Sequence, residues 1–392
     1  MSCLWGGGRL SRMTEFLSLH DFEAAARKRL PRSIFAFVEA GSEDGEALKA
    51  NRESWSRWAF KPRSLVDVSS RSQSVALFGR SYGSPFGIAP MGGAVVCGWR
   101  ADLDLSTAAQ EAGIPFVLSG AATTPLETVM EAAPGTWFQA YLSHDMARID
   151  ALLDRLKRAK VEVLVVTTDV AVMGNRENAL RAGFSLPPRL TPRLAWDGVS
   201  HPRWLVNAML RTLVRDGIPR QANFEAEPGA SILARKASPG DRRSRLGWEH
   251  IRHIRRRWNG PLVLKGVLSV KDARLALSHR VDGLILSNHG GRQLSSAVSP
   301  LEVLPEIRET APDIAIMIDG GLRRGGDVLK ARALGADMAF LGRPFLYAVS
   351  VAGHAGVLKA AAILRQEIDR DLALLGECSV SGLNAESLQR WR

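Results

Sequence analysis

Several polar side chains in this sequence stand where short apolar runs end, and their types suit proton transfer and anion binding. His289 lies in SNHGGRQ, where two glycines leave space around the imidazole. Asp169 ends another apolar run and could orient His289, because a carboxylate stabilises the imidazolium that forms when histidine accepts a proton. Arg292 and Arg176 could clamp a carboxylate. A structural histidine and a surface ion pair for Arg176 are the alternatives.

Two glycine-rich segments further along the chain predict a phosphate site. Glycines let the backbone approach a ligand closely, and arginines supply the opposite charge. A lone DGG is typical of a tight turn, but GRP at the end of the next apolar run favours phosphate. The residues of this predicted site are Asp319, Gly320, Gly321, Leu322, Arg323, Gly342 and Arg343.

Eight short apolar runs, separated by segments of helical periodicity such as 101–112, 146–159 and 270–278, would position these side chains. Continuous apolar strands are typical of parallel sheets that are buried on both faces. The pattern therefore predicts an α/β fold, a (β/α)8 TIM barrel, in which active residues lie at the carboxyl ends of the strands. A doubly wound sheet is the alternative, but no GxGxxG follows a first strand. The predicted strands are 85–90, 115–120, 136–142, 161–169, 261–267, 283–288, 314–320 and 338–342.

The flanking segments predict a single barrel domain over 14–392 with two additions. Residues 17–50 read as one or two helices that lead into the barrel, and 185–246 form a long insertion after strand four. Residues 1–13 are expected to be a disordered tail, or an over-long start with Met13 as the true first residue.

The chain has 392 residues and a net charge of +12, which favours an anionic partner. Its three cysteines are far apart and lack metal-ligand spacing, which indicates a reducing compartment and no metal site. The uncharged stretch 81–99 contains prolines and glycines, so a spanning helix there is not expected. The insertion alone carries eleven Lys or Arg against five Asp or Glu, a net +6.

The motifs SNHGGRQL, IDGGLRRGGDVLKARALGA and FLGRP, with FVLS, WFQAY, TTD and LVLKGV, carry a resemblance. In order and spacing the chain resembles the FMN-dependent 2-hydroxy acid dehydrogenase and oxidase family, which includes glycolate oxidase, L-lactate dehydrogenase and (S)-mandelate dehydrogenase. The resemblance runs from about Ser33 to Leu383. It implies an FMN enzyme that oxidises an L-2-hydroxy acid to the 2-oxo acid.

The resemblance also implies roles for individual residues. His289 would be the catalytic base and Asp169 its partner, while Tyr141, Arg176 and Arg292 would bind substrate. Whether the substrate loses a hydride or passes through a carbanion stays open. Lys265 would stabilise the negative charge of the reduced flavin. FMN would contact the phosphate-site residues and Pro90, Met91, Gly92, Ser119, Gln139, Thr167, Lys265 and Ser287.

Three positions depart from the family pattern. Phe37 stands four residues before Gly41, where the family usually has a substrate-binding tyrosine, so one hydroxyl donor is lost at a cost of about 0.5–1.5 kcal/mol. Ala121 replaces a bulky aromatic of glycolate oxidase. Together they predict a roomier, more apolar pocket for a bulky or aromatic, mandelate-like acid, with lactate as the smaller alternative. Gly92 replaces an alanine common in oxidases, which favours a dehydrogenase.

The basic insertion predicts binding to an anionic membrane surface. Within it, 201–217 reads as a helix with a basic edge and an apolar face that includes Trp204, Leu205 and Leu213. A helix docked on the barrel or on another subunit is the alternative. Because no assigned catalytic residue lies in 190–240, a short linker should replace that stretch without loss of the chemistry.

The resemblance to membrane-bound members implies a peripheral protein on the cytoplasmic face of the inner (plasma) membrane, otherwise cytoplasmic, that passes electrons to a quinone. It also implies a homo-oligomer, a tetramer in the family. A soluble oxidase that uses oxygen is the alternative within the family. The alternative from another class is a non-catalytic basic barrel that binds nucleic acid, but the sequence has no interleaving of aromatic and basic residues, so no nucleic acid partner is expected.

Overall fold

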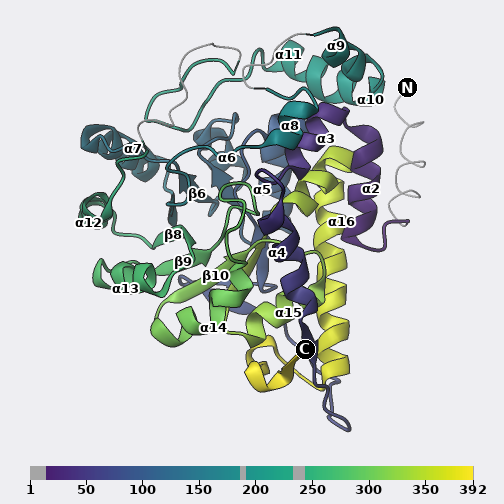
Figure 1. Cartoon of the computed structure of the whole chain (residues 1–392), viewed down its shortest axis with the longest axis vertical. Helices are drawn as coiled ribbons and strands as arrows, with labels where there is room; N and C mark the ends of the chain where they lie inside the picture. The colour runs from purple at the N-terminus through teal and green to yellow at the C-terminus, as the bar shows by residue number, and fades with distance from the viewer. Residues whose placement is uncertain (1–14, 186–190, 233–242, 392) are drawn as a thin grey trace.

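The computed structural model describes residues 15–185, 191–232 and 243–391 (Figure 1). Eight parallel strands follow one another in the order β4-β11-β10-β9-β8-β7-β6-β5, and a parallel bridge between Ile88 and Phe116 joins the first to the last. The predicted (β/α)8 barrel is confirmed. The strands are β4 (Phe86–Ile88), β5 (Val117–Ser119), β6 (Trp137–Ala140), β7 (Leu164–Thr167), β8 (Leu262–Val267), β9 (Gly283–Leu286), β10 (Ala315–Asp319) and β11 (Met338–Leu341), each inside a predicted run.

The barrel strands are apolar throughout because both of their faces are buried. Alternate side chains such as Trp137, Ile285 and Phe340 fill the interior, and the others pack beneath the outer helices. At the amino end of the strands, the hairpin of β2 (Val75–Leu77) and β3 (Arg80–Tyr82) covers the interior, and Trp137 Nε1 donates to Tyr82 Oη at 3.2 Å. The opposite end is therefore the one that can hold a site.

Helices surround the strands (Figure 1). Three helices, rather than the predicted one or two, lead into the barrel, because Pro31 and Gly45 interrupt the helical pattern. The helices before the insertion are α2 (Leu19–Arg29), α3 (Arg32–Glu39), α4 (Glu46–Ser56), α5 (Ala101–Glu111), α6 (Leu126–Ala132), α7 (Met146–Arg158) and α8 (Glu177–Arg181), with the short 3-10 turn η1 (Ala94–Val96). Those after it are α12 (Trp248–Arg257), α13 (Val270–Ser278), α14 (Pro300–Thr310), α15 (Gly325–Ala333) and α16 (Arg343–Leu375).

The C-terminal helix α16 is long and apolar enough to cross a membrane by length and composition alone. It packs against α2 and α5, more than half of its apolar window is buried, and its backbone breaks at Ala352 and Gly353. Packing on the barrel thus accounts for its composition. The chain then passes through η4 (Val380–Gly382) and η5 (Ala385–Ser387) to β12 (Leu388–Arg390), which pairs antiparallel with β1 (Trp58–Phe60).

In its described residues, the insertion contains α9 (Pro192–Val199) and one further helix, which lie together at one end of the molecule above α3 and α16 (Figure 1). The further helix is continuous from α10 (Pro202–Trp204) through a π-helical turn, η2 (Leu205–Leu210), to α11 (Arg211–Arg215). Gly217 follows its end with a φ of 76°, as the sequence predicted. The predicted disordered tail, 1–13, lies outside the described residues.

Candidate active site

His289 is held in a left-handed backbone conformation at the carboxyl end of β9. Its φ is 58°, and Gly290 and Gly291 continue the turn at 66° and 74°. Few non-glycine residues adopt this conformation, so surrounding contacts must hold it. His289 N donates to Ser287 Oγ at 3.0 Å, and its Nδ1 lies 3.1 Å from Asp169 Oδ1. Nε2 is therefore the ring nitrogen that faces the site, 3.5 Å from Tyr141 Oη.

A bulge at the end of β8 brings Lys265 and Asp169 into the same site. The register shifts between Lys265 and Val267, and Gly266 has a φ of 107°. A side chain at Gly266 would collide with Asp169, so glycine is required there. Burial raises the pKa of Asp169, but His289 and Lys265 outweigh that effect and the pKa is lowered. Asp169 is therefore an anion beside His289.

Lys265 lies between two acceptors. Its Nζ is 2.7 Å from Ser287 Oγ and 2.8 Å from Asp319 Oδ2. Burial lowers the pKa of Lys265, yet Asp319 and Asp169 more than offset this and the pKa is raised. The side chain is a fixed cation at the carboxyl end of the barrel.

The arginines form a cluster whose charges are not neutralised by carboxylates. Arg292 Nη1 donates to the carbonyls of Phe37, Val38 and Ala40, which leaves its Nε and Nη2 hydrogens for another partner. Burial lowers the pKa of Arg292 well below its usual value, and Arg176 and Arg343 lower it further. Arg176 Nε is buried without a hydrogen-bond partner in the described part of the chain. The cluster suits a carboxylate ligand.

The predicted phosphate segments also converge. Gly320 and Gly321 have φ values of 102° and 81°, and a side chain at Gly321 would collide with the Asn51 carbonyl. Arg323 is buried, burial lowers its pKa to about 10, and its Nε has no hydrogen-bond partner among the described residues. The amino terminus of α15 follows directly, which is a favourable place for a phosphate.

Arg343 makes contacts that the sequence did not indicate. Its Nε donates to Val38 O at 3.0 Å, and its Nη2 donates to Ala40 O and Gly290 O. Only Nη1 is left for a phosphate. Arg343 therefore joins the end of α3 to the His289 turn, whatever else it binds.

Several orphaned polar atoms at the strand ends fit a polar ligand such as FMN. Gln139 Nε2, Thr167 Oγ1 and Asp319 Oδ1 are buried with no hydrogen-bond partner in the described ranges. Such atoms are costly unless a ligand satisfies them. Ser119 Oγ donates to Gln139 Oε1 at 2.9 Å, which orients the amide. The residues present are compatible with the flavin that the sequence predicted.

Phe37 and Ala121 line the same end of the barrel. The Phe37 ring stacks on Phe184 at 4.2 Å and lies 5.2 Å from the Arg292 guanidinium carbon. A side chain at Gly92 would approach Ala121 Cβ at 2.6 Å. Packing against Ala121 therefore explains Gly92, and this glycine does not indicate the electron acceptor.

Sequence reasoning missed two sets of residues. Asn51 and Asn288 form a reciprocal pair of buried amide hydrogen bonds, at 2.7 and 2.8 Å, that joins α4 to the His289 turn. Arg243 and Phe224, both from the insertion, contact Tyr141. SNHGGRQ contained a signal for Asn288, but only the fold could identify its partner. No group of three potential metal-binding side chains occurs in the described residues.

A histidine paired with a carboxylate, an arginine cluster without carboxylate partners and a glycine-rich turn beside Arg323 lie together at the strand ends, an arrangement that suits a barrel enzyme for anionic substrates. Residues 26–390 match the model of the FMN-dependent dehydrogenase family. The chain belongs to this family of FMN-dependent 2-hydroxy acid dehydrogenases and oxidases, and FMN is its cofactor. It is therefore an enzyme, and the non-catalytic nucleic acid alternative is wrong.

Individual relatives agree with the family. The chain is 38% identical to (S)-mandelate dehydrogenase of Pseudomonas putida, over 95% of this chain and 93% of that protein. It is 34% identical to a putative L-lactate dehydrogenase of Mycobacterium tuberculosis, over 97% and 91%. A crystal structure of the monotopic membrane protein (S)-mandelate dehydrogenase superposes with a TM-score of 0.86 at 36% identity, over 96% and 99% of the chains.

The geometry of His289 leads to a first prediction. His289→Gln should retain FMN and the fold but slow flavin reduction by substrate at least about a hundredfold, the lower end of the usual contribution of a general base. Stopped-flow absorbance measures the rate, and the flavin spectrum reports retention. Reduction at nearly the wild-type rate would remove His289 from the mechanism.

The amide pair leads to a second prediction. Asn51→Ala removes two buried hydrogen bonds and should lower the free energy of unfolding by about 2–3 kcal/mol. The temperature at which FMN dissociates, measured by the rise in its fluorescence, should fall accordingly. Asn178→Ala, at an exposed position of α8, is the control and should leave that temperature unchanged. If both variants released FMN at the same temperature, the Asn51–Asn288 pair would contribute nothing to stability.

Proposed function

We propose that this enzyme oxidises a bulky, mandelate-like L-2-hydroxy acid to the 2-oxo acid and passes the electrons to a quinone at a membrane. The observation that carries the proposal is the His289–Asp169 pair, in which His289 Nε2 faces Tyr141 Oη at 3.5 Å. Flavin reduction by a panel of 2-hydroxy acids, followed by reoxidation with a quinone analogue or with oxygen, tests it. Faster reoxidation by oxygen would favour a soluble oxidase instead.

In the proposed reaction, each side chain has a separate task. FMN, when bound, accepts the two electrons that leave C2 of the substrate. His289 accepts the substrate proton at Nε2, and Asp169 stabilises the resulting imidazolium through Nδ1. Arg292 and Arg176 bind the substrate carboxylate, and Tyr141 donates to a substrate oxygen. Burial and nearby Asp169 raise the pKa of Tyr141, so it acts as a neutral donor.

The cofactor residues are assigned by the same reasoning. Arg323 and the remaining Nη1 of Arg343 would hold the phosphate beside Gly320 and Gly321, and Lys265 would supply positive charge to the flavin. The other proposed contacts are Pro90, Met91, Gly92, Ser119, Gln139, Thr167, Ser287, Asp319, Leu322 and Gly342.

The preference for a bulky substrate follows from two side chains. Ala121 is a small side chain at the position where glycolate oxidase has a bulky aromatic, and Phe37 with Phe184 forms an apolar wall next to Arg292. An aryl group could pack there, whereas a short acid would leave the wall uncovered. The proposed substrate class therefore depends on the size and polarity of these side chains.

The third prediction concerns this pocket. Mandelate should give a higher kcat/KM than glycolate, because each additional buried CH2 can contribute about 0.8 kcal/mol, or about fourfold. Ala121→Trp should fill the space and erase or reverse the preference. Steady-state assays with both acids measure the effect, and a wild-type enzyme that prefers glycolate would contradict the proposal.

The proposed membrane surface differs from the one that the sequence indicated. Trp204 is buried and its Nε1 donates to Val96 O at 2.7 Å, and Leu205 packs on the core, so neither can enter lipid. The expectation for these two was wrong because periodicity does not show which face of a helix docks. Leu213 is exposed, as expected, with other apolar side chains of α9–α11 and the following turn: Trp196, Val199, Val206, Met209, Leu210, Val214 and Ile218.

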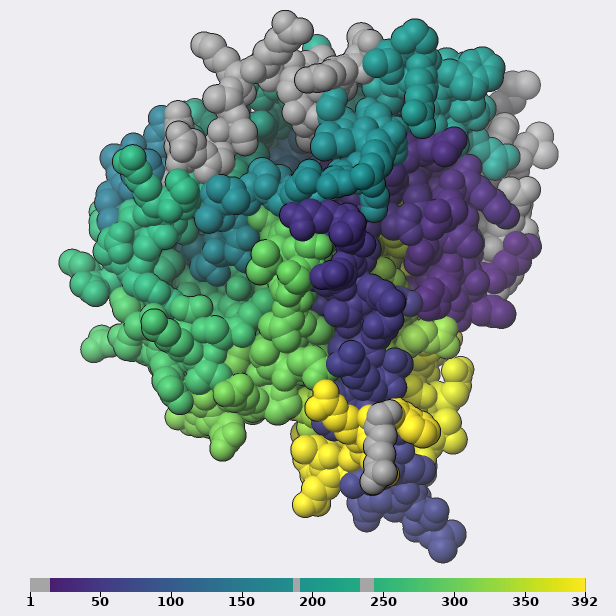
Figure 2. Space-filling view, viewed as in Figure 1, coloured from purple at the N-terminus to yellow at the C-terminus, as the bar shows by residue number. Residues whose placement is uncertain are grey.

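These residues lie at one end of the molecule, where the insertion (teal in Figure 2) projects beside the lead-in helices. Val214 is 80% exposed and Trp196 73%, which is unusual for large apolar side chains unless they contact a partner. Exposed Arg203 and Arg215 lie on the same helix. We propose that this surface binds anionic lipid, with the site on the cytoplasmic side. A homo-oligomer stays a prediction.

The segment proposed for lipid is shorter than 190–240. Asn223 is fully buried, and its side chain bonds to Leu126 N and to the carbonyls of Ala122 and Thr124. A linker in place of 190–240 would therefore remove a support of the turn after Ser119. Point substitutions on α11 leave this support in place, so they test the surface better than a linker does.

The fourth prediction tests the surface. Binding to anionic vesicles should weaken with salt, because the Debye length falls to about 3 Å at 1 M, but should persist in part through apolar burial. Leu213→Ser with Val214→Ser should abolish the salt-resistant part. Leu374→Ser, at an exposed apolar position of α16, is the control and should change nothing. No sedimentation with anionic vesicles at low salt would refute membrane binding and weaken the quinone assignment.

A further inference from the structure

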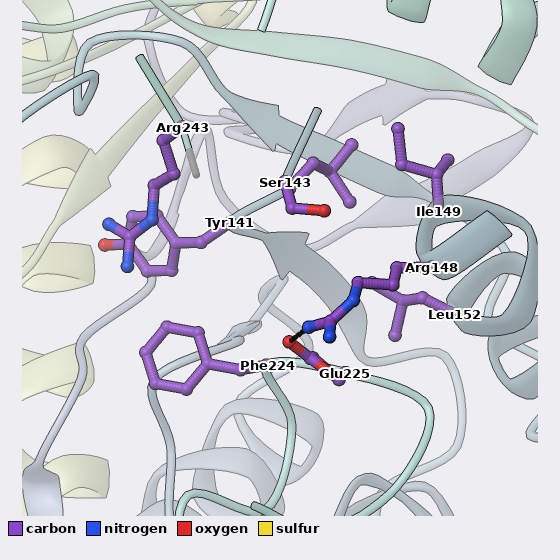
Figure 3. Close-up of a pocket in the computed structure, with 9 residues that line it drawn as sticks. Tyr141, Ser143, Arg148, Ile149, Leu152, Phe224, Glu225 and Arg243 are labelled. Atoms are coloured by element: carbon purple, nitrogen blue, oxygen red, sulfur yellow. Dashed lines mark hydrogen bonds and ion pairs between the residues drawn. The ribbon is translucent and has the colours of Figure 1, made fainter. Parts of the chain in front are cut away.

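Arg243, from the last part of the insertion, lies against the aromatic residues of the site. Its guanidinium carbon is 4.9 Å from the centre of the Tyr141 ring and 5.7 Å from that of Phe224 (Figure 3). The two rings are 5.9 Å apart. Tyr141 Oη faces His289, so the Tyr141 ring lies between Arg243 and the proposed proton acceptor.

The charge of Arg243 is not neutralised by the described residues. Its side chain forms no ion pair or hydrogen bond with any of them, whereas Arg148, on the same pocket, lies 2.6 Å from Glu225 Oε1. Burial lowers the pKa of Arg243, and Tyr141 opposes that effect only in part. A partly buried cation without a counter-charge is costly, so the position suits an anionic group that arrives with a ligand.

Arg243 stands apart from the arginines that would bind the C1 carboxylate of the substrate. Arg292 donates to the carbonyls of the segment that ends α3, whereas the Arg243 guanidinium lies over the rings of Tyr141 and Phe224. The remaining charges of the site are paired, His289 with Asp169 and Lys265 with Asp319. Among the described residues, Arg243 therefore has no counter-charge of its own.

We propose that Arg243 binds a second acidic group at the far end of the substrate. The preferred substrates are then 2-hydroxy acids whose bulky side chain ends in a carboxylate. Tyr141, Leu142 and Phe224 supply the apolar surface for the carbon skeleton between the two acidic groups. The inference rests on the proposed function, since it concerns the substrate of the same site.

The experiment compares mandelate with 4-carboxymandelate on the FMN-loaded enzyme. The wild type gives the higher kcat/KM for the diacid, and Arg243→Leu lowers the ratio of the two values about tenfold to a hundredfold, as expected for loss of a charge-assisted hydrogen bond. Arg243→Lys retains part of the ratio. Arg245→Leu removes an exposed arginine two residues away and leaves the ratio unchanged.

Calorimetry with the corresponding 2-oxo acids gives a second readout that needs no turnover. The dissociation constant of the carboxylated product rises selectively in Arg243→Leu, while FMN absorbance reports that the variant is folded. An unchanged ratio, whether both substrates weaken together or neither does, overturns the proposal. Absence of flavin reduction by any 2-hydroxy acid would instead refute the proposed function, and the binding data would still decide the role of Arg243.

Discussion

The carbonyl groups that end α3 hold two of the arginines on which the site depends. Arg292 and Arg343 both donate to Val38 O and Ala40 O, and the carboxyl end of a helix is a favourable place for cations. These acceptors offset part of the mutual repulsion of Arg292, Arg343 and Arg176. The short helix α3 thus allows positive charge to accumulate before any ligand arrives.

The opposite end of α3 is fixed by the insertion. Asp197 of α9 accepts from Arg32 N, Ser33 N and Ser33 Oγ at 2.9–3.0 Å, and backbone hydrogen bonds lower the pKa of this carboxyl despite its partial burial. Asp197 therefore caps the helix whose other end binds the arginines. The surface proposed for lipid and the site proposed for substrate are joined through a single eight-residue helix.

The features that the sequence predicted correctly are those that local residue patterns determine. All eight strands were found because their residues are apolar on both faces, and His289, Asp169 and Lys265 converge because parallel strands end at one edge. Contacts between distant segments could not be predicted in this way. The Asn51–Asn288 pair spans 237 positions, and two of the carbonyl partners of Arg343, Val38 and Ala40, lie 305 and 303 positions away. Trp204 was misjudged for the same reason, since its partner, Val96 O, lies on η1.

The described part of the insertion has two segments with different physical roles. Residues 219–225 belong to the barrel, because Ala222 and Asn223 are buried and Arg155 Nη1 donates to the carbonyls of Ala222 and Glu225. The helices α9–α11 are attached through buried Trp204 and Ala208 and through polar contacts, among them the Asp197 cap and the ion pair of Asp216 with Arg100. The apolar side chains that take no part in this docking, such as Trp196 and Val214, are exposed and available to a partner. The Asp197 cap of α3 therefore connects the outer helices to the site, while their outward apolar side chains stay available to a partner.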